Sequence, residues 1–222
     1  MKMLPGSGVP AETTIGRVSA MTLIIPIRQD LVPPLVTGPG EDGSPVVSIG
    51  TGPPVRPVEN LRTALSAVAE LVAASQPMGL NQVATIHFAR WVIINGGRDL
   101  LFCANFDGSL DQYLTDFMVV ANTREAPYMD IVWGTCVDYP GSEPTAFVAW
   151  ARRWLIDTTL FFPTIPDLTI KDIAWLRQFR RLFCAFDRAA QMVPDDSWPP
   201  ELLAHYRQLK TATNAIDLSV VI

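Results

Sequence analysis

The sequence predicts an α+β protein in which helices cover one face of an antiparallel, ferredoxin-like sheet and a helical extension follows. Apolar residues make up 49% of the 222 residues and charged residues only 18%, which is enough material for a buried core. Segments with helical spacing alternate with β-rich segments, and a tight hairpin signal stands between two of these. A β-α-β-β-α-β series with a hairpin in the middle is the ferredoxin-like arrangement.

Short β-rich runs bounded by turn residues predict the strands, over residues 20–28, 83–94, 99–106 and 158–162. The sequence Asn-Gly-Gly-Arg at 95–98 supplies the positive φ angles that a hairpin turn needs. Apolar residues spaced three and four apart predict the helices, over residues 58–75, 109–118, 124–136, 142–154, 169–192 and 197–210. Ser109 with Gln112 forms a capping box, and Thr169 caps the long helix near the C-terminus.

The chain divides into three parts, a flexible N-terminal arm (1–19), an α+β domain (20–163) and a helical C-terminal extension (164–222). The first 60 residues hold 10 of the 19 prolines and 8 of the 14 glycines. Because proline fixes φ and removes a backbone donor, the stretch 31–57 is expected to be a structureless surface insertion. A stretch of this length is either functional or disordered, and it is a candidate contact for a partner protein.

Charge and cysteine content exclude several classes. The net charge is −5 with a pI near 5.0, so a nucleic-acid partner is not expected. No apolar run reaches the roughly 20 residues of a membrane-spanning helix. The N-terminus lacks the apolar core of a secretory signal, and the three cysteines are widely spaced, so a reduced, cytoplasmic protein is expected.

The runs MTLIIPIR, IHFARWVII and LLFCANFDGSLDQYL resemble segments of small dimeric α+β-barrel proteins, which are distant relatives of the dye-decolorising peroxidases and chlorite dismutases. The likeness covers about residues 20–163. It implies a homodimer, haem as a cofactor and a peroxidase-like oxidoreductase activity. In the peroxidases a Gly-x-x-Asp-Gly motif places an aspartate on the distal side of haem.

The matching segment here begins with Ala104 in place of the first glycine, so only Asp107 and Gly108 carry over. The peroxidases also have two ferredoxin-like halves, the second of which supplies the proximal histidine. This chain has room for one half, and beyond residue 163 its only histidine is His205.

His87 is the first candidate for chemistry. Alternation along a strand puts it on one face with Trp91, and with Cys103 and Asn105 if the hairpin register pairs them. Polar groups on a half-buried face need partners, so His87, Trp91 and Asn105 are candidates for binding haem or another small ligand. A hydrogen-bonded core histidine at a contact between chains is the alternative interpretation.

Asp107 and Arg90 complete the candidate catalytic set with His87. Asp107 could act as a distal acid–base group, although Asp-Gly before a capping box also suits an ordinary strand-to-helix turn. Arg90 could bind a carboxylate or propionate, or pair with an acidic residue on an adjacent helix. Because the chain has only two histidines, a three-histidine zinc site is excluded, and no metal site is predicted.

Two functions remain open. The first is a small oxidoreductase or a haem- or small-ligand-binding protein, and the second is a non-catalytic assembly or interaction subunit that uses the open sheet face and residues 31–57. An apolar sheet face needs a cover, which a second copy, the C-terminal helices or a ligand could provide, so a homo-oligomer is expected. Arginines beside aromatic residues in the helix 169–192 either point outward from a packed helix or contact a partner or a membrane surface peripherally.

Overall fold

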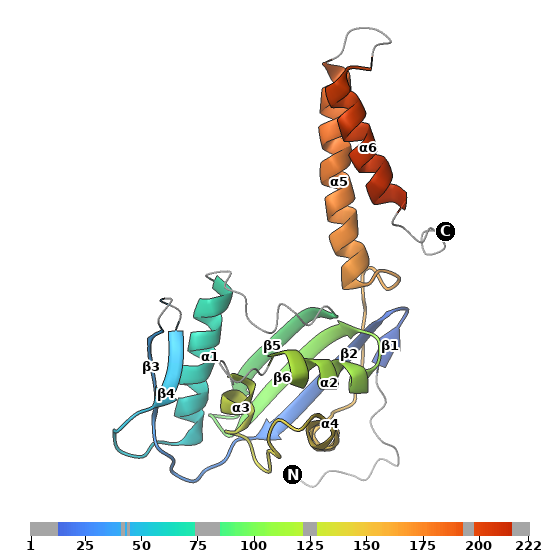
Figure 1. The fold of residues 1–222 in the computed structure, drawn as a ribbon. Helices are drawn as coiled ribbons and strands as arrows, with labels where there is room; N and C mark the ends of the chain where they lie inside the picture. Colours follow the sequence, from blue (N-terminus) through green and yellow to red (C-terminus); the bar gives the residue numbers. More distant parts are fainter. Residues whose placement is uncertain are drawn as a thin grey trace. The chain divides into compact units, whose positions relative to one another are not determined.

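A computed structural model describes residues 13–40, 43, 45–73, 85–121, 128–192 and 198–214 of the chain. Its contacts divide the chain into two compact units, Met1–Thr164 and Ile165–Ile222. The sequence placed this boundary between residues 163 and 164. Figure 1 shows the helices and strands of both units.

The first unit is built on a four-stranded antiparallel sheet with the order β1-β2-β6-β5. Its strands are β1 (Thr13–Ile15), β2 (Val18–Pro26), β5 (Ile86–Ile94) and β6 (Asp99–Asp107). The predicted hairpin between β5 and β6 is confirmed, and Asn95, Gly96 and Gly97 in its turn all have positive φ. The α+β class with an antiparallel sheet is therefore confirmed, and the sheet is open and not closed into a barrel.

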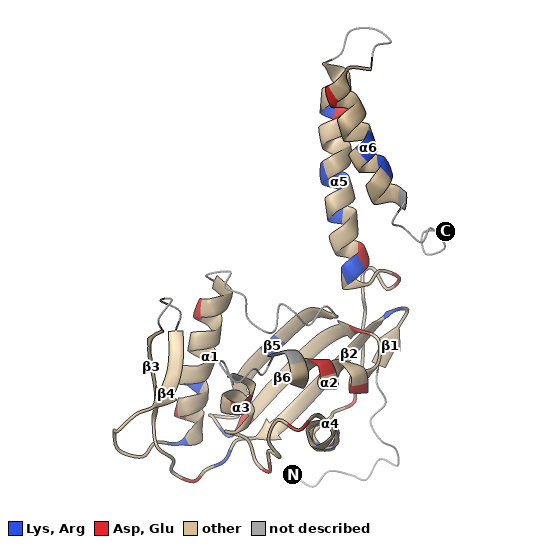
Figure 2. Cartoon of the chain, in the orientation of Figure 1, with Lys and Arg blue, Asp and Glu red and all other residues tan. Residues whose placement is uncertain are grey.

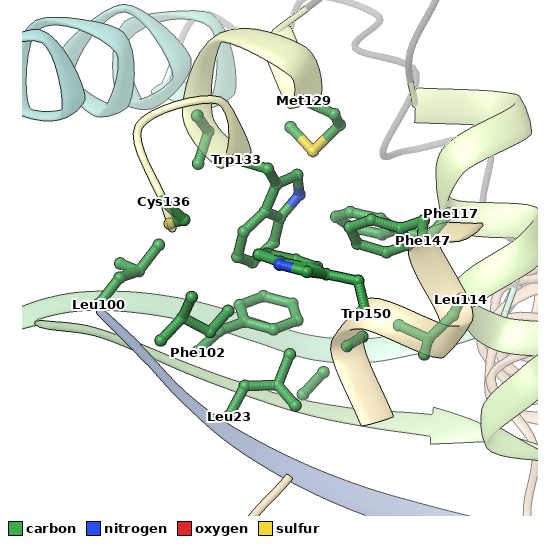
Figure 3. Close-up of a cluster of buried hydrophobic side chains, with 14 of the residues drawn as sticks. Leu23, Leu100, Phe102, Leu114, Phe117, Met129, Trp133, Cys136, Phe147 and Trp150 are labelled. Carbon is green, nitrogen blue, oxygen red and sulfur yellow. The ribbon is translucent and has the colours of Figure 1, made fainter. Parts of the chain in front are cut away.

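Four helices pack against one face of this sheet (Figure 1). They are α1 (Pro57–Ala73), α2 (Leu110–Ala121), α3 (Tyr128–Trp133) and α4 (Pro144–Arg153). All four begin within or near the segments predicted to be helical. The first residues of the helix predicted over 124–136 cannot be compared, because residues 122–127 lie outside the described residues. Trp133 is fully buried at the centre of the core, 5.1 Å from the ring of Phe102 and 6.0 Å from that of Trp150 (Figure 3).

Local capping explains where α2 and α4 begin. The Ser109 hydroxyl accepts from the Gln112 amide at 3.4 Å, but the Gln112 side chain donates to Asp116, so only half of the predicted capping box forms. At α4 the Glu143 carboxylate accepts from two backbone amides, and Pro144 occupies the first turn, where its missing N–H costs nothing. These backbone hydrogen bonds lower the pKa of Glu143.

The strand predicted over 158–162 does not form. Leu155 makes an isolated antiparallel bridge to Leu23 on the outer edge of β2. Continuing that register would bring residue 158 opposite Ala20, whose outer edge is already paired with Thr13 of β1. β1 (Thr13–Ile15), which the sequence assigned to the N-terminal arm, thus belongs to the sheet and occupies the place of the predicted strand.

The expectation of a structureless insertion over 31–57 is also wrong. The stretch contains a separate two-stranded antiparallel sheet of β3 (Leu35–Pro39) and β4 (Pro45–Ile49). Asn60, buried on α1, ties it down by accepting from the Leu35 amide and donating to the Pro33 carbonyl, both at 2.8 Å. The prolines keep these strands out of the central sheet, as expected, but permit a short surface ribbon.

The second unit is a helical hairpin of α5 (Ile170–Gln191) and α6 (Pro200–Asn214). The predicted cap of α5 is confirmed, since Thr169 and Asp172 form a complete capping box. The predicted start of α6 at Ser197 lies outside the described residues. No residue of α5 is buried, and the two helices meet through partly exposed aromatic side chains. No helix in the described ranges is long and apolar enough to cross a membrane.

Candidate functional site

The face of the sheet opposite the helices, called the open face below, follows from the strand register. Residues directly opposite one another on β2, β6 and β5 form four rows: Ala20–Asn105–Phe88, Thr22–Cys103–Arg90, Ile24–Leu101–Val92 and Pro26–Asp99–Ile94. Their sequence neighbours point into the core, because side chains alternate along a strand. The open face therefore carries apolar side chains in several rows.

Exposure distinguishes the open face from the packed one. Phe88 is 72% exposed, and Arg90 is also exposed. Ile24, Val92 and Leu101 form one continuous half-buried apolar row. Phe88 together with this half-buried row makes the open face a candidate for contact with another molecule.

His87 and Asp107 meet at one end of the sheet. The register of β5 shifts between Ile86 and Phe88, so His87 is an extra residue in a β-bulge. Its Nε2 atom lies 2.6 Å from Oδ1 of Asp107, and each side chain is only 10% exposed. The Asp107 amide donates to the Thr85 carbonyl at 2.9 Å, which fixes the aspartate at the end of the hairpin.

This contact defines what the pair can do chemically. A carboxylate only accepts, so Nε2 carries the hydrogen in the contact and Nδ1 is the acceptor in the neutral ring. A histidine oriented in this way can take up a proton at Nδ1. The Thr85 hydroxyl, which belongs to the same end of β5, is buried without a hydrogen-bond partner among the described residues.

The predicted grouping of His87, Trp91, Cys103 and Asn105 on one face is wrong. Trp91 points into the core, where its ring lies 4.8 Å from Phe102. The hairpin register pairs Trp91 with Phe102 and so places it on the packed face, and the bulge reverses the face on which His87 lies relative to Trp91. Nothing in the local sequence marks the bulge, since it contains no glycine.

The remaining candidates lie on the open face but apart from the His87–Asp107 contact. Asn105 is opposite Phe88, one row from Asp107, and Arg90 is opposite Cys103, one row further. Arg90 forms no ion pair within the ranges that the structure describes, so the predicted pairing with an acidic helix residue is not seen there. The structure therefore brings together two of the five candidate residues.

A polar groove that sequence analysis missed lies at the other end of the sheet. Its volume is about 650 Å³, and its polar lining includes Arg28, Gln29, Asn95, Arg98 and Asp99. These residues come from the segment that follows β2 and from the hairpin turn with the start of β6, which are distant in sequence. Neither His87 nor Asp107 contributes to it.

The cysteines and metal-ligating residues show no site in the described part of the chain. All three cysteines are free, and burial raises the pKa of the Cys136 thiol to about 12, so this thiol stays neutral and unreactive. The described residues contain no cluster of three or more histidine, cysteine, aspartate or glutamate side chains placed to hold a metal ion.

Comparisons of the chain with protein-family models, with curated proteins and with solved structures found no match. The resemblance to α+β-barrel proteins therefore stays a prediction.

Proposed function

We propose that the protein is a self-associating interaction subunit and that two copies meet through the open face of the sheet. The observation that carries this proposal is Phe88, a large apolar side chain that is 72% exposed on a strand whose other face is packed. Removing apolar surface from water is favourable, and a second copy would bury this side chain and the half-buried rows beside it.

The order of the rows suits a two-fold contact. The row Thr22–Cys103–Arg90 lies between the row that contains Phe88 and the row that contains Leu101. In a contact with a two-fold axis through the middle row, each of the outer rows meets the other one of the second copy. With the axis along the middle row, Phe88 faces Val92 and Ala20 faces Ile24 of the second copy. Asn105 then faces Leu101, and the middle row with Arg90 faces itself.

We also propose that the sheet has the ferredoxin-like arrangement and that two copies together form the dimeric barrel. The adjacent strands β2, β6 and β5, with α1 between β2 and β5 and α2 after β6, match the order of three of the four strands in that arrangement. Closure of a barrel would require the sheet of a second copy. The β3–β4 ribbon, where Ile49 is 74% exposed, is the contact proposed for a partner protein.

The test is the molecular mass in solution of the full chain and of Phe88→Asp. We expect the wild type to sediment at twice the 24.4 kDa chain mass and the variant to sediment as a monomer. Val119→Asp is the matched control, because Val119 is 61% exposed on α2 and lies away from the open face. A monomeric wild type, or a Phe88→Asp variant that still forms dimers, would contradict the proposal.

A second candidate function is small-ligand binding or oxidoreductase chemistry at His87. The 2.6 Å contact with Asp107 and the unpartnered Thr85 hydroxyl favour it. The residues do not fit haem as they are arranged, because Nε2 of His87 is taken by Asp107 and Trp91 lies on the other face. A small molecule with a proton donor for Nδ1 fits better.

An absorption spectrum of the purified protein tests the haem expectation directly. A Soret band that is lost in His87→Ala would overturn the conclusion that these residues do not fit haem. If the protein is colourless and the NMR resonances of the His87 ring shift when a small acid is added, ligand binding at Nδ1 is supported.

A further inference from the structure

Helix α5 carries four exposed arginines that the open face does not use. Arg177, Arg181 and Arg188 share one face of the helix because four and seven residues separate them, and Arg180 lies beside them. Figure 2 shows these positive charges spread along α5. A shallow hollow of about 740 Å³ lies among the guanidinium groups and is otherwise lined by Ala174 and Cys184.

These arginines have no acidic partner in the described ranges. The two acids of α5 are engaged within the helix, because Asp172 closes the capping box and Asp187 accepts from Gln191 at 2.9 Å. Like charges one helical turn apart destabilise a helix. An anion outside the helix would remove this repulsion, and arginine binds carboxylate and phosphate groups with two parallel hydrogen bonds.

An apolar stripe runs beside the arginine face. Leu176 is 39% exposed and Phe183 is 48% exposed, and their spacing of seven positions places both on one side of α5. Packing against α6 leaves both side chains partly in water. Arginines beside an exposed apolar stripe are typical of a helix that lies in the lipid interface, where long basic side chains reach the phosphates.

We propose that α5 binds the surface of an anionic lipid bilayer. Arg177, Arg181 and Arg188 contact lipid phosphates, and Leu176 and Phe183 enter the boundary between headgroups and acyl chains. This inference is independent of the proposed contact through the open face.

Two other occupants fit less well. A nucleic acid would offer phosphates but no apolar counterpart for Leu176 and Phe183. The first unit of a second copy carries 15 acidic against 10 basic residues, yet several of its exposed carboxylates are already paired. These pairs are Asp111 with Arg152, Asp138 with Arg153 and Glu59 with Arg62.

The experiment is co-sedimentation of the full chain with vesicles of phosphatidylcholine alone and of phosphatidylcholine mixed with phosphatidylglycerol. We expect binding to the mixed vesicles only, and weaker binding as salt is added. The double variant Arg177→Gln with Arg181→Gln should partition about 30-fold less well, since each basic residue contributes about 1 kcal/mol at such a surface. Arg56→Gln with Arg62→Gln is the control that removes the same charge from the first unit and leaves binding unchanged.

Two further variants keep the test decisive. Arg177→Lys with Arg181→Lys retains the charge and should retain most of the binding, whereas Phe183→Ser should weaken binding without changing its salt dependence. Circular dichroism checks that every variant keeps its helix content. Equal binding to both vesicle types, unchanged binding by the glutamine variant, or binding to RNA or poly-glutamate in place of vesicles would each overturn the proposal.

Discussion

The two faces of the central sheet are both rich in apolar residues but differ in what covers them. On the packed face Leu23, Ile25 and Phe102 are at most 1% exposed beneath the helices. On the open face Phe88 is 72% exposed, although it lies only three residues from Trp91 in the core. A sheet with one face in water normally alternates apolar and polar residues. The open face mixes apolar side chains with polar ones such as Asn105 and Arg90, and its apolar side chains are those that a second copy would cover in the proposed function.

The run over 20–28 already contains this difference. It reads AMTLIIPIR, in which the positions facing the helices are all apolar and those on the other face are Ala20, Thr22, Ile24 and Pro26, of which only Thr22 is polar. The helices account for one of these faces. A second molecule accounts for the other in the proposed function.

The largest expected effect is on the packed face. Trp133→Ala should lower the free energy of unfolding by about 3–5 kcal/mol, because it leaves a cavity among the rings of Phe102, Phe147 and Trp150. Denaturant unfolding of the two proteins measures the difference. A loss of less than about 1 kcal/mol would show that this face is not the core on which the unit depends.

The second-largest effect on the free energy of unfolding is expected at His87. His87→Ala should lower the free energy of unfolding by about 1–3 kcal/mol, because it removes the 2.6 Å hydrogen bond to Asp107 at a nearly buried position. Melting temperature and ligand occupancy are measured on the same variant. If ligand binding falls 100-fold or more while stability is unchanged, His87 serves ligand chemistry and not the fold.

The sequence predicted those parts of the unit that depend on neighbouring residues. The β5–β6 hairpin follows from Asn95, Gly96 and Gly97, and the start of α5 follows from Thr169. Contacts between distant segments were not predictable in this way. The pairing of β1 with β2 excludes a strand at 158–162, and no local pattern reveals that competition.

The candidate site shows the same limit. Two of its residues, His87 and Asp107, do meet, and their role as site residues stays a prediction. The hairpin register pairs Trp91 with Phe102 on the packed face, and the bulge between Ile86 and Phe88 changes the face of His87 relative to Trp91, so the expected cluster does not form. A shift of one residue changes the face of every side chain beyond it, and the backbone geometry that sets the shift is not visible in a single sequence.

Thiol labelling compares the reactivity of one cysteine on each face of the sheet. Cys136 is buried in the core, and its pKa is raised to about 12, whereas Cys103 is half-buried on the open face. Under native conditions Cys136 should not react with a thiol reagent until the protein unfolds. Cys103 should react faster in monomeric Phe88→Asp than in the wild type, and equal rates would argue against a contact through the open face.

The raised pKa of Cys136 also has a consequence for stability. Because the neutral thiol is favoured in the folded state, its contribution is fully present below the unfolded pKa of about 8.5 and is lost as pH rises toward about 12. Unfolding at pH 8 and pH 10 measures this loss. Cys136→Ala should remove the part of the alkaline decline that comes from this thiol.

The smallest effect is expected at Phe88 in the monomer. In dilute solution, where two copies are apart, Phe88→Ser should change the free energy of unfolding by about 0.5 kcal/mol or less, because the side chain is already mostly in water. At high protein concentration the wild type should become more stable and the variant should not, since association stabilises only the folded chain that can associate. Melting curves over a dilution series measure both proteins. A concentration-independent melting temperature for the wild type would mean that its open face finds no second copy, and a large loss in the dilute variant would mean that Phe88 belongs to the monomer's own core.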